Sequence, residues 1–129
     1  MLRNLGWEVE TVREHNWENE KHDYVLVARA RELGRVFLTF DRLRKTSGIE
    51  VAREIHENGG RVIVVAGGPD QPIERAVGRL LFHHPEWFPF LRESEGWVYI
   101  SDLKHNCQLR LRSSLHAEVR RTVPKPLEP

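Results

Sequence analysis

The sequence predicts an α/β protein with a mostly parallel central sheet and helices on both faces, arranged in three layers. Two nearly unbroken apolar runs, Val36–Phe40 and Val62–Ala66, have the composition of strands that are covered on both faces. A third apolar run, Trp97–Ile100, follows later in the chain. Segments with apolar residues at helical spacing separate these runs, which is typical of parallel strands joined by crossover helices.

The N-terminal part of the chain contains a strand and a helix by the same reasoning. A short segment that ends at Gly6 is interpreted as the end of a helix. Residues 7–12 alternate apolar and polar side chains, which predicts a half-buried or edge strand. A polar loop is expected over residues 14–22. Asp23 then caps or begins a helix that Gly34 ends.

The central part is expected to continue the alternation of strands and helices. Asp41 directly follows the first apolar strand, and a basic loop runs from Arg42 to Ser47. A helix over residues 49–57, closed by Gly59 and Gly60, precedes the second strand. After that strand, Asp70 is predicted to cap a helix, and Pro85 to end it. The buried stripe of this helix is expected to contain Ile73, Ala76, Val77, Leu80 and Leu81.

The C-terminal part is rich in aromatic residues. The segment over residues 83–91 is expected to cover the end of the sheet, and a surface that stacks bases or binds a partner is the alternative. A last edge strand is predicted over residues 109–112. The domain is expected to span residues 1–123, with a loose tail over 124–129 that carries three prolines, Pro124, Pro126 and Pro129.

Composition limits the environment in which the protein works. The chain has 129 residues, which suits one domain, and 30% of them are charged. A net charge of +1 neither requires nor excludes a nucleic-acid partner. The single cysteine excludes an intrachain disulfide and fits a reducing compartment. Because no apolar stretch has the length of a signal peptide or a membrane span, we expect a cytoplasmic protein with no membrane contact.

Two carboxylates are placed where an α/β sheet binds its ligands, beyond the carboxyl ends of the strands. Asp41 follows a central strand, and Asp23 opens the helix that leads into this strand. Such a pair could hold Mg²⁺ or Mn²⁺, polarise a phosphate and activate a water for phosphodiester cleavage. Spacing alone also permits a helix cap at Asp23 and a turn at Asp41.

The cations Arg42, Arg44 and Lys45 directly follow Asp41. They could bind RNA phosphates beside a metal site, or form a solvated surface loop. The loop Gly67–Asp70 offers another possibility, a phosphorylated ligand at a helix start, although it matches no established phosphate-binding pattern.

Histidines near the aromatic segment offer a further candidate site. His83 and His84 could line a pocket with Trp87 and His105, although a surface at a helix end is the expected position. The run from His105 to Cys107 resembles a fragment of a zinc site, but the second cysteine of such a site is lacking.

The N-terminal half resembles a known family. The resemblance rests on three features: Gly6-Trp-Glu-Val, an Asp that opens a helix, and the run from Ala28 to Arg42, which ends in Thr39-Phe-Asp-Arg. These features resemble the small PIN-like proteins of bacteria and archaea, which are related to PIN-domain toxins of type II toxin–antitoxin systems. The resemblance covers residues 2–70 well and the later elements loosely.

This resemblance implies a metal-dependent ribonuclease that uses Mg²⁺ or Mn²⁺. Asp23 and Asp41 match two acids of the family's set, and Leu43 stands where a further acid is usual. The family's first strand and its Asp have no counterpart, so the fold is expected to be N-terminally truncated. The exposed sheet edge would favour a homodimer. The alternative is a non-catalytic PIN-like module that binds RNA or an antitoxin-like protein partner.

Overall fold

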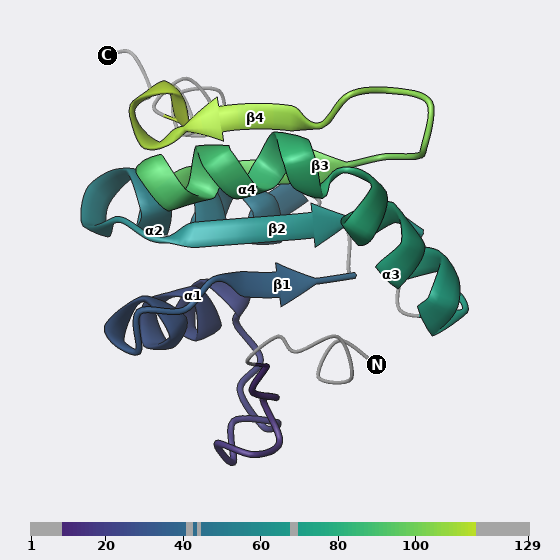
Figure 1. The fold of residues 1–129 in the computed structure, drawn as a ribbon. Coiled ribbons are helices and arrows are strands. Elements are labelled where there is room, and N and C mark those ends of the chain that lie inside the picture. The colour runs from purple at the N-terminus through teal and green to yellow at the C-terminus, as the bar shows by residue number, and fades with distance from the viewer. Residues whose placement is uncertain (1–8, 41–42, 44, 68–69, 116–129) are drawn as a thin grey trace, which may run out of the picture.

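The structure is a computed structural model, and it describes residues 9–40, 43, 45–67 and 70–115. Within these ranges, one sheet contains four strands in the order β1-β2-β3-β4 (Figure 1). The strands are β1 (Phe37–Thr39), β2 (Arg61–Val65), β3 (Gly96–Ile100) and β4 (Gln108–Leu111). The first three are parallel to one another, and β4 pairs with β3 in the antiparallel direction. The prediction of an α/β fold with a mostly parallel sheet and a final edge strand is confirmed.

One helix precedes the first strand, and further helices connect the parallel strands. They are α1 (Asp23–Glu32), α2 (Lys45–Asn58), α3 (Ile73–Phe82) and α4 (His84–Glu93), followed by the short 3₁₀ helix η2 (Arg112–Leu115). In Figure 1, α4 crosses in front of the sheet and α2 lies behind it. Among the described residues, no helix combines the length and the apolar character that a membrane span needs.

Two apolar cores are built on the sheet, because successive strand residues point to opposite faces. Val62 and Val64 pack with Val27 of α1 and with a set from α2: Val51, Ala52 and Ile55. Ile63 and Val65 pack instead with residues of α3 and α4: Ala76, Leu80, Trp87 and Leu91. Burial on both faces explains why β2 is an unbroken apolar run rather than an alternating one.

Two helix ends depend on glycine, as the sequence predicts. Gly34 follows α1 with a φ of 69°, and its N–H donates to the Arg31 carbonyl at 3.0 Å. Gly59 follows α2 with a φ of 90° and donates to the Ile55 carbonyl at 2.8 Å. Other residues rarely adopt a positive φ, so these positions favour glycine.

The strand predicted over residues 7–12 is wrong for its described part. Residues 9–12 form no strand, and the chain turns directly afterwards. The Val12 carbonyl accepts the N–H groups of His15 and Trp17, at 3.3 and 2.9 Å, and Asn16 has a φ of 59°. Alternation of apolar and polar residues indicates a half-buried segment, but a strand also needs hydrogen bonds to a neighbouring strand. Here the backbone forms hydrogen bonds within its own turn instead.

Three predicted helix boundaries are also wrong. Helix α2 begins at Lys45, so it includes part of the predicted basic loop. Asp70 does not cap α3, because Pro72 occupies that position and no side chain makes a capping bond. Pro85 does not stop a helix but lies in the first turn of α4, where the missing N–H costs nothing.

The aromatic segment is therefore helical, and its apolar side chains cover a face of the sheet rather than its end. Trp87 and Leu91 are buried against β2 and β3, whereas Phe88 is 43% exposed. The predicted helix end at Gly6 and the predicted tail over 124–129 lie outside the described residues.

Candidate functional site

The carboxyl ends of β1, β2 and β3 lie at one edge of the sheet, because these strands are parallel. Each strand is followed there by a connection that carries polar residues. The connections are residues 40–44 after β1, residues 66–72 after β2 and residues 101–107 after β3. The candidate site residues fall in these connections and at the helix starts beside them.

Asp23 is the first residue of α1 and is half-buried. The residue before it, His22, lies with Nδ1 3.9 Å from an oxygen of Glu50, in the second turn of α2. The start of α1 therefore lies beside the first part of α2, the helix that follows the 41–44 segment in the chain. Asp41, Arg42 and Arg44 lie outside the described residues, and Lys45 begins α2.

Leu43, between these positions, is described. Its side chain is half-buried and packs against the core formed by α1 and α2. The position at which the PIN-like resemblance implies a further acid is thus used for packing.

In the connection after β2, two side chains hydrogen-bond to the backbone at the end of the strand. The Ala66 carbonyl accepts hydrogen bonds from Gln71 Nε2 at 3.0 Å and from Arg79 Nη1 at 2.6 Å. Asp70 is exposed in this connection. Gln71 and Arg79 therefore satisfy a backbone carbonyl at the carboxyl end of β2.

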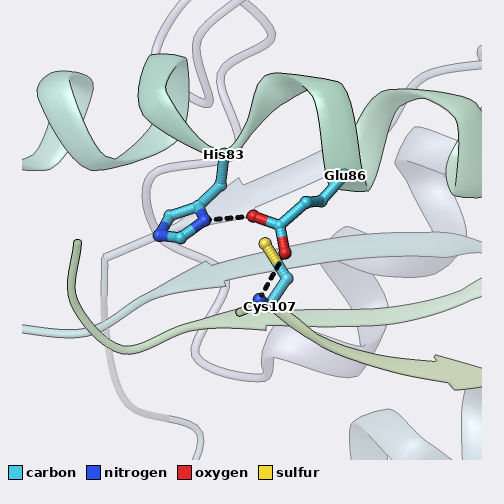
Figure 2. Close-up of side chains that lie close together, drawn as sticks. All are labelled: His83, Glu86 and Cys107. Atoms are coloured by element: carbon cyan, nitrogen blue, oxygen red, sulfur yellow. Dashed lines mark hydrogen bonds and ion pairs between the residues drawn. The ribbon is translucent and has the colours of Figure 1, made fainter. Parts of the chain in front are cut away.

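A cluster of three chemically active side chains lies where the connection after β3 meets the start of α4. A ring nitrogen of His83, a carboxylate oxygen of Glu86 and Cys107 Sγ all lie within 4.8 Å of one another. Figure 2 shows that the three side chains point toward one another. His83 is only 2% exposed, while Glu86 and Cys107 are half-buried.

The hydrogen bonds of this cluster determine where its protons lie. His83 Nε2 is 2.5 Å from the Asp102 carbonyl oxygen, which can only accept, so Nε2 carries a hydrogen. Nδ1 of the same ring hydrogen-bonds one carboxylate oxygen of Glu86, and the Cys107 N–H donates to the other at 3.2 Å. The ring is thus held on both sides, and one proton lies between His83 and Glu86.

The electrostatics of the cluster oppose a thiolate. The hydrogen bond from His83 lowers the pKa of Glu86, which keeps that carboxyl ionised. Burial, and then the charge of Glu86, raise the pKa of the Cys107 thiol from 9.0 to about 12. A thiol that stays protonated near neutral pH is a poor nucleophile.

Asp102 and His105 form a separate turn beside the cluster. One Asp102 oxygen accepts the N–H groups of Lys104 and His105, and His105 Nδ1 lies 2.8 Å from the other. These hydrogen bonds, chiefly with His105, lower the pKa of Asp102 to about 2. Both side chains are exposed. His105 thus pairs with Asp102, and Cys107 pairs with the helical residues instead.

The cluster differs from the sequence-based expectation. The sequence predicts His83 at a surface, but this residue, which lies between α3 and α4, is buried. Cys107 lies 21 residues from Glu86, so no local spacing brings these groups together. The available signal was Pro85, because proline is favoured in the first turn of a helix as well as after a helix end.

A groove lies apart from the three residues of this cluster. It has a volume of about 820 Å³ and lies next to β1, between the segment over residues 9–17 and α4. Apolar side chains such as Leu33, Trp87 and Phe88 dominate its walls. Arg35 pairs with Glu10 at 3.1 Å, and Arg61 donates to the Leu91 carbonyl at 2.7 Å. These two cations are therefore paired with protein groups in the structure.

Comparison of the chain with protein-family models, with curated proteins and with solved structures gave no match. The PIN-like resemblance of residues 2–70 stays a prediction from the sequence.

Proposed function

We propose that the chain is a PIN-like metal-dependent ribonuclease, in which Asp23 and Asp41 bind Mg²⁺ or Mn²⁺. The main support is that α1 begins at Asp23, beside the helix that follows Asp41 in the chain. Strand β1 ends at Thr39, two residues before Asp41, in a mostly parallel sheet that has helices packed against both faces. This agrees with the three-layer arrangement that the resemblance implies.

The proposed reaction is hydrolysis of an RNA phosphodiester. Asp23 and Asp41 would hold the metal ion, which would polarise a phosphate oxygen and supply an activated water for attack on phosphorus, with the ribose oxygen as the leaving group. Two carboxylates alone hold Mg²⁺ weakly, so the substrate phosphate completes its coordination. Arg42, Arg44 and Lys45 follow Asp41 and would hold the neighbouring phosphates.

The second candidate is a non-catalytic PIN-like module that binds RNA or an antitoxin-like protein, as a homodimer. One observation favours it: Leu43 occupies the position of a family acid and packs against the core. Replacing Leu43 with an acidic residue would remove this apolar contact and bring a charge to the edge of the core. The local packing therefore suits a protein that does not use an acid at this position.

Calorimetric titration with Mn²⁺ distinguishes the two candidates. We expect binding in the wild-type chain that is lost in Asp41→Asn and in Asp23→Asn. Asp70→Asn is the matched control, because Asp70 is an exposed acid in the neighbouring connection. Retained binding in Asp41→Asn, or none in the wild type, would leave the non-catalytic module as the better proposal.

Cleavage of a labelled single-stranded RNA provides the functional readout. We expect Mn²⁺-dependent cleavage by the wild type and none by Asp41→Asn. A double change of Arg42 and Arg44 to alanine should weaken RNA binding and reduce its salt dependence, because each phosphate contact releases counterions. RNA binding without cleavage in the wild type would identify the non-catalytic module.

A further inference from the structure

We propose that His83, Glu86 and Cys107 form a second metal site, which takes a transition-metal ion of the Zn²⁺ type. The three donor atoms are an imidazole nitrogen, a carboxylate oxygen and a sulfur, all within 4.8 Å of one another. They come from the α3–α4 junction, the first turn of α4 and the connection before β4 (Figure 2). An ion there would tie this connection to α4.

The surroundings already orient two of the three ligands. His83 donates from Nε2 to the Asp102 carbonyl, which leaves Nδ1 as the nitrogen that faces the other two groups. Histidines that bind metals almost always donate their second N–H in this way, and this bond fixes the ring. The Cys107 N–H holds one Glu86 oxygen, so the other oxygen is directed at His83.

The spacing of the donors suits a tetrahedral ion after small movements. Bonds of about 2.0–2.3 Å to Zn²⁺ place tetrahedral ligands roughly 3.3–3.8 Å apart. The 4.8 Å limit of the cluster requires a slight approach of the side chains, and the hydrogen-bonded His83 and Glu86 must separate slightly. Three protein ligands leave the fourth position for water or a small ligand, and the half-buried Glu86 gives the ion a path from solvent.

The donor set also selects the ion. Sulfur and imidazole nitrogen favour Zn²⁺ and Co²⁺, whereas Mg²⁺ and Mn²⁺ prefer carboxylate, carbonyl and water oxygens. The site is therefore chemically distinct from the proposed site at Asp23 and Asp41, and either can be present without the other.

A nucleophilic cysteine is the other chemistry that these residues suggest, and the geometry opposes it. Both nitrogens of His83 are engaged, with Asp102 and Glu86, so neither is directed to accept the thiol proton. The Glu86 charge disfavours a thiolate beside it. A divalent cation reverses this effect, because it is attracted to the carboxylate and the thiolate together. Its binding releases the thiol proton and the proton between His83 and Glu86 to solvent.

Titration of the wild-type chain with Co²⁺ tests the site directly. Because the chain has a single cysteine, a thiolate-to-cobalt charge-transfer band in the near ultraviolet identifies Cys107 as a ligand. We expect this band at one ion per chain, with the visible spectrum of a tetrahedral ion, and its displacement by Zn²⁺ but not by excess Mg²⁺. Absence of the charge-transfer band in the folded wild-type chain would overturn the proposal without any variant.

Competition with a chromophoric chelator then measures Zn²⁺ affinity in variants. Loss of a ligand should weaken binding by about 100-fold or more, so we expect this in Cys107→Ser and Glu86→Gln. His105→Ala is the matched control, because His105 lies two residues from Cys107 but pairs with Asp102. Unchanged affinity in both ligand variants, or loss only in His105→Ala, would show that Zn²⁺ binds elsewhere.

Discussion

At the scale of single residues, the environment of Cys107 makes its thiol unreactive. Raising the pKa from 9.0 to about 12 lowers the thiolate population near pH 8 by roughly a thousandfold. We therefore expect iodoacetamide to alkylate the folded, metal-free chain about 10³-fold more slowly than the chain in denaturant. Mass spectrometry of timed samples, kept in the presence of a chelator, measures both rates.

The cause of this low reactivity can be separated into burial and charge. Glu86→Gln removes the carboxylate charge and keeps the shape of the side chain, so alkylation of Cys107 should become faster. It should stay slower than in denaturant, because burial makes the larger contribution. Equal rates for the folded and denatured wild type would show that the thiol is not held in this environment.

Glu86 is also expected to stabilise the fold in a pH-dependent way. Its pKa is lower in the folded chain than its ordinary value of 4.5, so the ionised carboxylate stabilises the fold above about pH 4.5. This contribution is lost as the pH falls through the lowered pKa. Glu86→Gln should reduce the free energy of unfolding by about 1 kcal/mol near neutral pH, and the difference should shrink on acidification.

Urea unfolding of the metal-free chain at several pH values measures this effect. Glu93→Gln is the matched control on the same helix, because Glu93 is 70% exposed and pairs with Arg92 at the surface. Its effect should stay within about 0.5 kcal/mol at every pH. If the loss of unfolding free energy in Glu86→Gln were the same at every pH, the charge of the Glu86 carboxylate would contribute nothing to stability.

At the scale of elements, α3 allows a sharp test of the core on one face of the sheet. Leu80 is 1% exposed and packs with β2 and β3, whereas its neighbour Leu81 is 37% exposed. Leu80→Ala should cost about 2–5 kcal/mol, because it leaves a cavity among packed side chains. Leu81→Ala should cost less than about 1 kcal/mol. Similar losses in both variants, measured by urea unfolding, would contradict the orientation of α3.

The elements also show how far the sequence predicts this protein. The unbroken run around β2 predicted its burial on both faces, and Gly34 and Gly59 predicted two helix ends, because these signals are local. The strand predicted over residues 7–12 is wrong for residues 9–12, since a strand depends on a partner that local alternation does not reveal. Pro85 was misinterpreted because proline suits both the end of one helix and the start of the next.

The candidate sites follow the same rule. The proposal for Asp23 and Asp41 could be made from the sequence, because both residues are adjacent to elements whose type the local pattern predicts. The cluster of His83, Glu86 and Cys107 could not, since it depends on how the connection after β3 packs against α4. Cys107 reaches Glu86 only because the connection from β3 to the antiparallel strand β4 passes beside the start of α4.

At the scale of the whole molecule, the two proposed metal sites should stabilise the fold independently. Each ion binds the folded chain preferentially, so saturation at about 100 times its Kd should add roughly 2.7 kcal/mol to the free energy of unfolding. We expect Zn²⁺ to raise the Tm of the wild type and of Asp41→Asn equally, because the proposed Zn²⁺ ligands do not include Asp41. Mn²⁺ should raise the Tm of the wild type and of Cys107→Ser, but not of Asp41→Asn. Thermal unfolding of the three proteins with each ion measures this pattern. Loss of the Zn²⁺ effect in Asp41→Asn would show that the two sites are coupled or shared, because independent sites give additive effects.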